Sequence, residues 1–180
     1  YMGSLKVETG NGKIVAKNLQ QLADVSCVTD NAAIVLEEFA AQKLSVESKN
    51  GAISLHDVQA DQSLALHATN GFIGLTGCTS PEIGIATRNG AIHLTQVQAA
   101  QAIRVESSNG AISLDSLESP DIQLQNQIGA ITGSIQGKKA DYRIVTEQKL
   151  GENNLTDQSG GTKQLQVKTN LGRIHVTFNE

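Results

Sequence analysis

Apolar and polar residues alternate along most of the 180-residue chain, and a recurring Asn-Gly pair separates the alternating stretches. The pattern is clearest at residues 47–55, which read ESKNGAISL, and at residues 106–114, which read ESSNGAISL. Alternation with a period of two is typical of β-strands that bury one face. No stretch sustains the 3.6-residue period of an amphipathic helix. The pattern therefore predicts an all-β protein.

The alternating unit repeats every 19 to 22 residues over nearly the whole chain. Aligned on the glycine of the Asn-Gly pair, or on its replacement, the units have corners at Gly12, Ala32, Gly51, Gly71, Gly90, Gly110, Gly129, Gly151 and Gly172. Five positions before the corner and two positions after it, nearly every unit carries a Val, Ile, Leu or Cys. Such a period indicates a solenoid in which each coil stacks on the next.

A third apolar position distinguishes a solenoid from a meander of hairpins, for which Asn-Gly is also a strong signal. It lies seven residues after the corner, at Leu19, Phe39, Val58, Cys78, Val97 and Leu117. A hairpin has no need of a third strand, so we predict a single-stranded parallel β-helix of about nine coils. Three short parallel sheets would surround an Ile/Val/Leu core. We interpret residues 1–180 as one solenoid domain, residues 1–4 as an expression remnant, and a native N-terminal segment as missing.

The corner asparagines are expected to stack into a ladder, each side-chain amide bonding the next. The ladder comprises Asn11, Asn31, Asn50, Asn70, Asn89 and Asn109. We expect the Asn and Gly to turn the corner with positive φ, which Gly adopts easily and Asn tolerates. The repeated phrase is therefore interpreted as a structural signal and not as an active-site motif.

The repeat also resembles a known family. Units of the form V-x-(T/S)-x-N-G-x-I-x-(L/V), together with the closing stretch that begins ADYRIVTEQKLGENNLTD, are similar to a bacterial adhesin-like family of short-repeat β-solenoids, mainly described as a domain of unknown function. The resemblance covers nearly all of the chain and departs from the pattern at Ala32, Ile128 and Leu150. It implies a right-handed coil and an association with the bacterial cell envelope or the extracellular space. The residues themselves do not specify a compartment.

Composition narrows the classes of function. The net charge of −4 argues against a nucleic-acid binder, which needs a concentrated basic surface. No apolar run approaches the ~18 residues of a membrane span. Cys27 and Cys78 lack Cys or His neighbours at ligand spacing, and two coils of separation rule out a disulfide between them. We therefore expect two free, buried thiols, and no cofactor or metal.

Candidate catalytic groups are scattered. Glu47 and Glu106 share one outward column but lie three coils apart, about 14 Å by strand spacing. That separation is too large for the carboxylate pair of a glycosidase. The histidines point outward from different faces or distant coils, at His56, His67, His93 and His175. No catalytic residue is therefore predicted.

One surface feature stands out, a flat strip of small outward-facing residues just after the corners. Its candidate binding residues are Phe72, Arg88, Ala91, His93 and Ala111. The strip indicates a non-catalytic adhesin-like or scaffold module that binds a protein or a cell-envelope polymer. Crowding after a tight corner also explains the alanines without any ligand. A carbohydrate-active β-helix enzyme and a structural solenoid that self-associates through its ends remain as alternatives.

Overall fold

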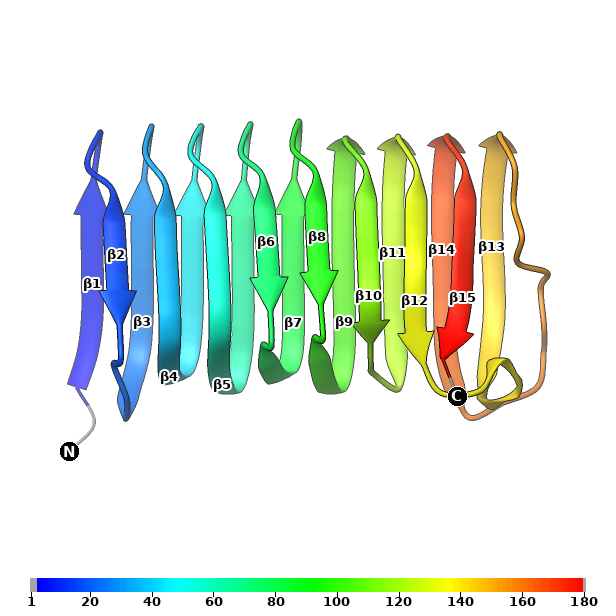
Figure 1. The fold of residues 1–180 in the computed structure, drawn as a ribbon, viewed down its shortest axis with the longest axis horizontal. Coiled ribbons are helices and arrows are strands. Elements are labelled where there is room, and N and C mark those ends of the chain that lie inside the picture. The colour runs from blue at the N-terminus through cyan, green and yellow to red at the C-terminus, as the bar shows by residue number, and fades with distance from the viewer. Residues whose placement is uncertain (1–2, 180) are drawn as a thin grey trace.

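The computed structural model describes residues 3–179 as one continuous β-solenoid (Figure 1). Strands account for 71% of the structure, which winds through about eight turns and contains no α-helix within the described range. The strands are β1 (Gly3–Thr9), β2 (Ile14–Lys17), β3 (Leu22–Thr29), β4 (Ile34–Ser48), β5 (Ile53–Ala68), β6 (Ile73–Thr76), β7 (Thr79–Thr87), β8 (Ile92–Thr95), β9 (Gln98–Asn109), β10 (Ile112–Leu117), β11 (Asp121–Ile128), β12 (Ile131–Gln136), β13 (Tyr142–Leu150), β14 (Lys163–Leu171) and β15 (Ile174–Asn179). The predicted all-β solenoid is confirmed.

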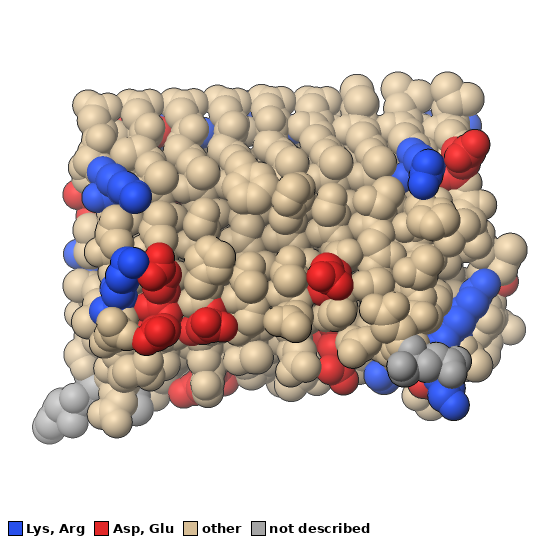
Figure 2. Space-filling model, in the orientation of Figure 1, with Lys and Arg blue, Asp and Glu red and all other residues tan. Residues whose placement is uncertain are grey.

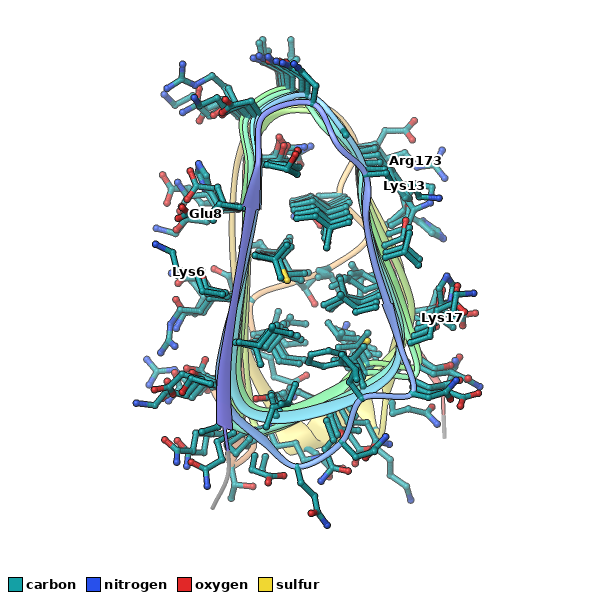
Figure 3. All side chains as sticks on the ribbon, turned by 90° about the vertical axis from the view of Figure 1, so that its left-hand side faces the viewer. Lys6, Glu8, Lys13, Lys17 and Arg173 are labelled. Atoms are coloured by element: carbon teal, nitrogen blue, oxygen red, sulfur yellow. The ribbon has the colours of Figure 1, made fainter. Side chains whose placement is uncertain are left out.

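Each coil has two long sides that meet at the Asn corner and are joined at the opposite end by a short base (Figure 3). We call the side that contains β1, β3, β7, β9, β11, β14 and β13 the first side. The second side contains β2, β6, β8, β10, β12 and β15, while β4 and β5 bend around the base and belong to both. Seen from the N-terminal end, the chain runs clockwise as it recedes, so the solenoid is right-handed.

The repeats stack in the register that the sequence columns indicate, and all strand pairs between coils are parallel. Val7 pairs with Cys27, and Cys27 with Val46, along the first side. One column of buried isoleucines runs along the second side, through Ile14, Ile34, Ile53, Ile73, Ile92, Ile112, Ile131 and Ile174. Each buried isoleucine contributes about 1.5–3 kcal/mol to folding. The core is therefore a set of ladders that run the length of the molecule.

The corner glycines are required for a reason that the sequence did not reveal. A Cβ on Gly51, Gly71 or Gly90 would collide with the backbone carbonyl of the corner in the preceding coil. None of these three glycines has a φ in the left-handed region, so the expectation of positive φ at this corner is wrong for them. Close packing between coils, and not backbone conformation, excludes a side chain there.

The expectation of positive φ is confirmed at the last three corners, where Gly129, Gly151 and Gly172 have φ of 137°, 135° and 159°. In the earlier coils, left-handed backbone occurs at the start of the base, six residues after the corner. The residues concerned are Asn18, Glu38, Asp57, Gly77, Gln96 and Ser116, with φ between 49° and 64°. This turn directs the next residue inward, and Phe39 and Val58 are accordingly buried at the base. Only Leu19, in the first coil, is exposed at this third apolar position.

The last two coils exchange their order in space. β14 pairs with β11 on one side and with β13 on the other, and β15 pairs with β12. After β12, the chain skips one position, forms β13 at the outer edge and then returns to insert β14 and β15 (Figure 1). Between β13 and β14 the described chain forms no second-side strand, so the coil that begins at Gly151 is incomplete and the turns number about eight and not nine.

The segment between β13 and β14 closes the C-terminal end. Ile144 and Gln158 exchange backbone hydrogen bonds of 2.9 Å, and the amide of Asn154 bonds both backbone groups of Val176 at 2.8 and 2.9 Å. The side chain of Leu155 is buried against the core. Both outer strand edges at this end, β13 and β15, are therefore partly covered by the chain itself.

Candidate functional site

The second side of the solenoid presents a broad surface without charged residues (Figure 2). We call this surface the uncharged strip. Its outward residues are Ala33, Ala52, Phe72, Ala91, Ala111 and Ala130 in one column and Val35, Ser54, Gly74, His93, Ser113 and Thr132 in the next. Lys13 and Arg173 occupy the first of these columns at the two ends of the solenoid. The strip is flat because small side chains on a regular parallel sheet repeat from coil to coil.

Phe72 is the one large aromatic on the uncharged strip. Its side chain is 38% exposed, and its ring lies over Gly74, two residues further along the chain in β6. The Phe72 and His93 rings pack edge to face, with ring centroids 5.0 Å apart and planes at 88°. This edge-to-face packing holds both rings in place. The pair forms a raised, preorganised feature on an otherwise low surface.

Four of the five predicted binding residues lie together, and one does not. Ala91 and Ala111 are half-buried and lie in the same column of the uncharged strip as Phe72, one and two coils further along. Arg88 lies on the first side, where it lines a hollow of about 200 Å³ with residues that include His67 and Glu106. The Asn corner separates Arg88 from the strip, because outward positions before and after the corner face opposite directions.

The Asn corner carries the expected ladder. Asn31 donates to the side-chain oxygen of Asn11 at 2.7 Å, and the same bond recurs in every coil as far as Asn109 at 3.0 Å. Just inside the corner, hydroxyls bond the corner backbone; the Ser48 Oγ, for example, accepts the N–H of Gly51 at 2.9 Å. The Asn side chains are thus occupied by one another, as a structural ladder requires.

Beyond Asn109 the ladder continues with exposed apolar side chains. Ile128 pairs with Asn109 on one side and with Leu171 on the other, and Leu171 pairs with Leu150. These three side chains are 52%, 46% and 67% exposed. Contiguous exposed apolar residues are typical of contact surfaces. All three residues directly precede a corner glycine, where the earlier coils carry Asn, and the exchanged coil order places Leu171 between Ile128 and Leu150.

The first side has a shallow hollow of about 310 Å³ with a floor of small residues and a charged rim. The rim includes Glu47, His67, Arg104 and Glu106. Two strands separate those of Glu47 and Glu106, which places their carboxyls about 14 Å apart by strand spacing. Glycosidase carboxylates lie at most about 9.5 Å apart. These two residues therefore form no carboxylate pair.

A second hollow, of about 600 Å³, runs across several coils at the base. Asp61, Glu118 and Lys163 contribute charge to its lining. Glu118 accepts a hydrogen bond of 3.0 Å from Gln98, and Asp61 accepts one of 3.0 Å from Gln59. Both carboxylates thus bond neighbouring glutamine side chains, and the charged groups of this hollow do not converge on one point.

The cysteines are free and buried. Burial raises the pKa of Cys27, and it raises the pKa of Cys78 to about 11 although backbone hydrogen bonds oppose the shift. Thiols with raised pKa are poor nucleophiles at neutral pH. Within residues 3–179, no three His, Cys, Asp or Glu side chains gather closely enough to hold a metal ion. No helix in that range is long and apolar enough to cross a membrane.

Comparison with protein families identifies one match. The family model described as Toastrack DUF4097, a domain of unknown function, matches residues 1–177. Comparisons with curated proteins and with solved structures gave no match. The match covers nearly the whole solenoid, including the exchanged coils at its C-terminal end.

Proposed function

This chain belongs to the Toastrack family, a domain of unknown function, and we propose that it is a non-catalytic, adhesin-like or scaffold module of the bacterial cell envelope. It binds a partner protein or an envelope polymer on the uncharged strip. The Phe72–His93 pair forms the anchor of that surface. The main support for this proposal is that an exposed, preorganised aromatic pair stands on a surface made of alanine, glycine and serine.

Physical reasons favour the uncharged strip over the other surfaces. A partner that covers the strip removes no charged side chain from water, so the desolvation penalty is small. Aromatic residues in the centre of a contact surface supply much of the binding energy at low entropic cost. The strip also runs along the solenoid, which suits an extended polymer or a second β-rich surface.

The enzyme alternative receives no support from the carboxylates of the first side. Glu47 and Glu106 are too far apart, and the acids at the base are bonded to glutamine side chains. The surface features therefore fit a binding protein better than a glycoside hydrolase.

A substitution at the anchor tests the proposal. Phe72→Ser should weaken binding to isolated cell-wall sacculi about tenfold, as expected when a central aromatic contact is lost. The measurement is co-sedimentation of the purified chain at increasing concentrations of sacculi. If the partner is a protein, a photo-crosslinking residue introduced at position 72 in the native cells should capture it. External protease treatment of those cells shows whether the chain is surface-exposed.

Val145→Ser is the matched control, because Val145 is 39% exposed on β13, on the first side. It should leave binding unchanged. Equal binding by the wild type and the Phe72→Ser variant would place the contact elsewhere. A purely cytoplasmic location, or the absence of both sacculus binding and crosslinks at position 72, would contradict the envelope role.

A further inference from the structure

The N-terminal end of the solenoid leaves two strand edges unpaired around an exposed part of the core. Among the strands of residues 3–179, β1 pairs only with β3, and β2 pairs only with β4. Between them lies a hollow of about 510 Å³ whose lining includes Leu5, Val7 and Ile14. Free edges of this kind are templates for pairing with another chain. We propose that this end pairs with the same end of a second copy, giving a two-fold symmetric dimer.

Head-to-head pairing is favoured because the other end is closed. Within residues 3–179, the segment around Leu155 partly covers the C-terminal end and bonds Ile144 and Val176, so the two outer edges there are already partly occupied. Head-to-tail stacking would have to displace this segment. A two-fold interface uses the open end twice and forms a closed dimer with no further growth.

The shape of the end defines the pairing (Figure 3). β1 runs towards the Asn corner and β2 runs away from it, along opposite sides of a cross-section that narrows at this corner. Turning a second copy over about an axis from base to corner keeps both narrow corners together. It also places β1 of each copy against β2 of the other, with the strands antiparallel. The interface therefore contains two equivalent antiparallel ladders.

The backbone groups needed for these ladders point out of the end. The carbonyl of Thr9 accepts the N–H of Asp30, and the N–H of Ile14 donates to the carbonyl of Ala33, so these groups face the next coil. Backbone direction alternates along a strand. The intervening residues, which carry the outward side chains, consequently direct their N–H and C=O groups away from the solenoid.

Charge selects one register. Residues directly opposite in an antiparallel ladder point to the same side. Two such registers keep the Asn corners of the two copies at the same height. One places Glu8 opposite Lys13 and Lys6 opposite Val15, while the other places Lys6 opposite Lys17 and leaves Glu8 facing Val15. Lys6 and Glu8 project from one side of the end, and Lys13 and Lys17 from the other (Figure 3).

The first register is therefore favoured, because it pairs opposite charges and avoids facing lysines. It also sets Val7 against Ile14 and Leu5 against Ala16 on the inward side, where all four side chains are apolar. The cores of the two solenoids then continue into each other. This surface is separate from the uncharged strip, so the dimer and the proposed partner binding succeed or fail independently.

Sedimentation velocity on the 180-residue chain tests the proposal. The wild type should form a dimer that strengthens at low salt. Glu8→Lys and Lys13→Glu should each weaken it about tenfold or more, because each places like charges opposite one another. The double variant restores an opposite pair and should recover most of the wild-type affinity. Val15→Pro should abolish the dimer by removing an outward N–H, which a free edge strand tolerates in the monomer.

Lys138→Glu is the charge-matched control, since Lys138 is exposed near the opposite end of the solenoid. It should leave the dimer unchanged, and far-ultraviolet circular dichroism should show every variant folded. A wild type that stays monomeric at high concentration would overturn the proposal. A dimer that is indifferent to both Glu8→Lys and Val15→Pro would overturn it equally, because it would have to use another surface.

Discussion

The two ends of this solenoid handle the same physical problem in opposite ways. At the C-terminal end, Leu155 is buried and the segment around it bonds the outer strands. At the N-terminal end, Val15 and Leu19 are 49% and 37% exposed, and the edges of β1 and β2 are bare within the described residues. Interior coils are covered on both sides by copies of themselves.

The difference shows that stacking alone does not complete a solenoid. Every interior coil receives its hydrogen bonds and apolar contacts from two neighbours, whereas an end coil receives them from one. The chain meets this need at one end with a segment that departs from the repeat. Within the described residues, the other end keeps the features of an interior coil without the second neighbour.

The largest expected effect comes from breaking the closed end. Leu155→Asp should lower the free energy of unfolding by about 4 kcal/mol, because a buried apolar contact is lost and a charge is placed against the core. Leu19→Asp, at the open end, should change it by about 0.5 kcal/mol or less. Urea unfolding followed by circular dichroism measures both.

Both substitutions are best made together with Glu8→Lys, so that dimer formation does not add to the stability of the open end. Similar losses in the free energy of unfolding from Leu155→Asp and Leu19→Asp would contradict the contrast between a closed and an open end.

A smaller loss of stability is expected from a substitution at an interior corner, and a still smaller one at the outermost corner. Gly71→Ala should destabilise by about 3 kcal/mol, because its Cβ would overlap the carbonyl of Gly51 in the preceding coil. Gly12→Ala should cost less than about 1 kcal/mol, because its Cβ meets only the Thr9 side chain. Thermal or urea unfolding gives the comparison, and equal losses would show that corner conformation, and not close packing, requires glycine.

The closed end should also respond to alkaline pH. Burial, with the nearby Glu118 and Asp141 carboxylates, raises the pKa of Tyr142 from 10 to about 12. A raised folded-state pKa contributes stability that is complete below pH 10 and is lost as the pH rises towards 12. The loss should reach roughly 2–3 kcal/mol. Unfolding measured across this range, with phenolate absorbance as a direct readout of ionisation, checks the expectation.

Tyr142→Phe is the control for this pH effect. The variant should lack the decline that begins near pH 10 but keep any decline that starts near pH 9, because the raised pKa of Cys78 acts in that lower window. A wild type and a variant with identical profiles above pH 10 would show that Tyr142 ionises normally in the folded chain.

Much of the fold could be predicted because the information is local and repeated. The buried column through Ile53 and Ile73 and the Asn ladder follow from residue alternation and from the 20-residue period. The uncharged strip followed from the same columns, and the structure packs Phe72 against His93 within it. The structure places Arg88 on the first side and not on the strip, because Arg88 lies two residues before the corner Gly90, where outward side chains face a different side from those after the corner.

Other features depend on contacts that no local pattern contains. The left-handed column at Glu38 and Asp57 carries no shared residue type, so no composition signal marks it. The exchanged order of β13 and β14 follows from where the chain finds unpaired edges and not from the order of the repeats.

The sequence by itself thus determined the strand period, the inward and outward faces, the stacking register and the position of the corners, since each coil repeats the same short-range pattern. Only the tertiary structure decided why the corner glycines are needed, which coil lies outermost and which end is closed. Those properties arise between coils, where backbone meets backbone and where the last segments compete for the free edges.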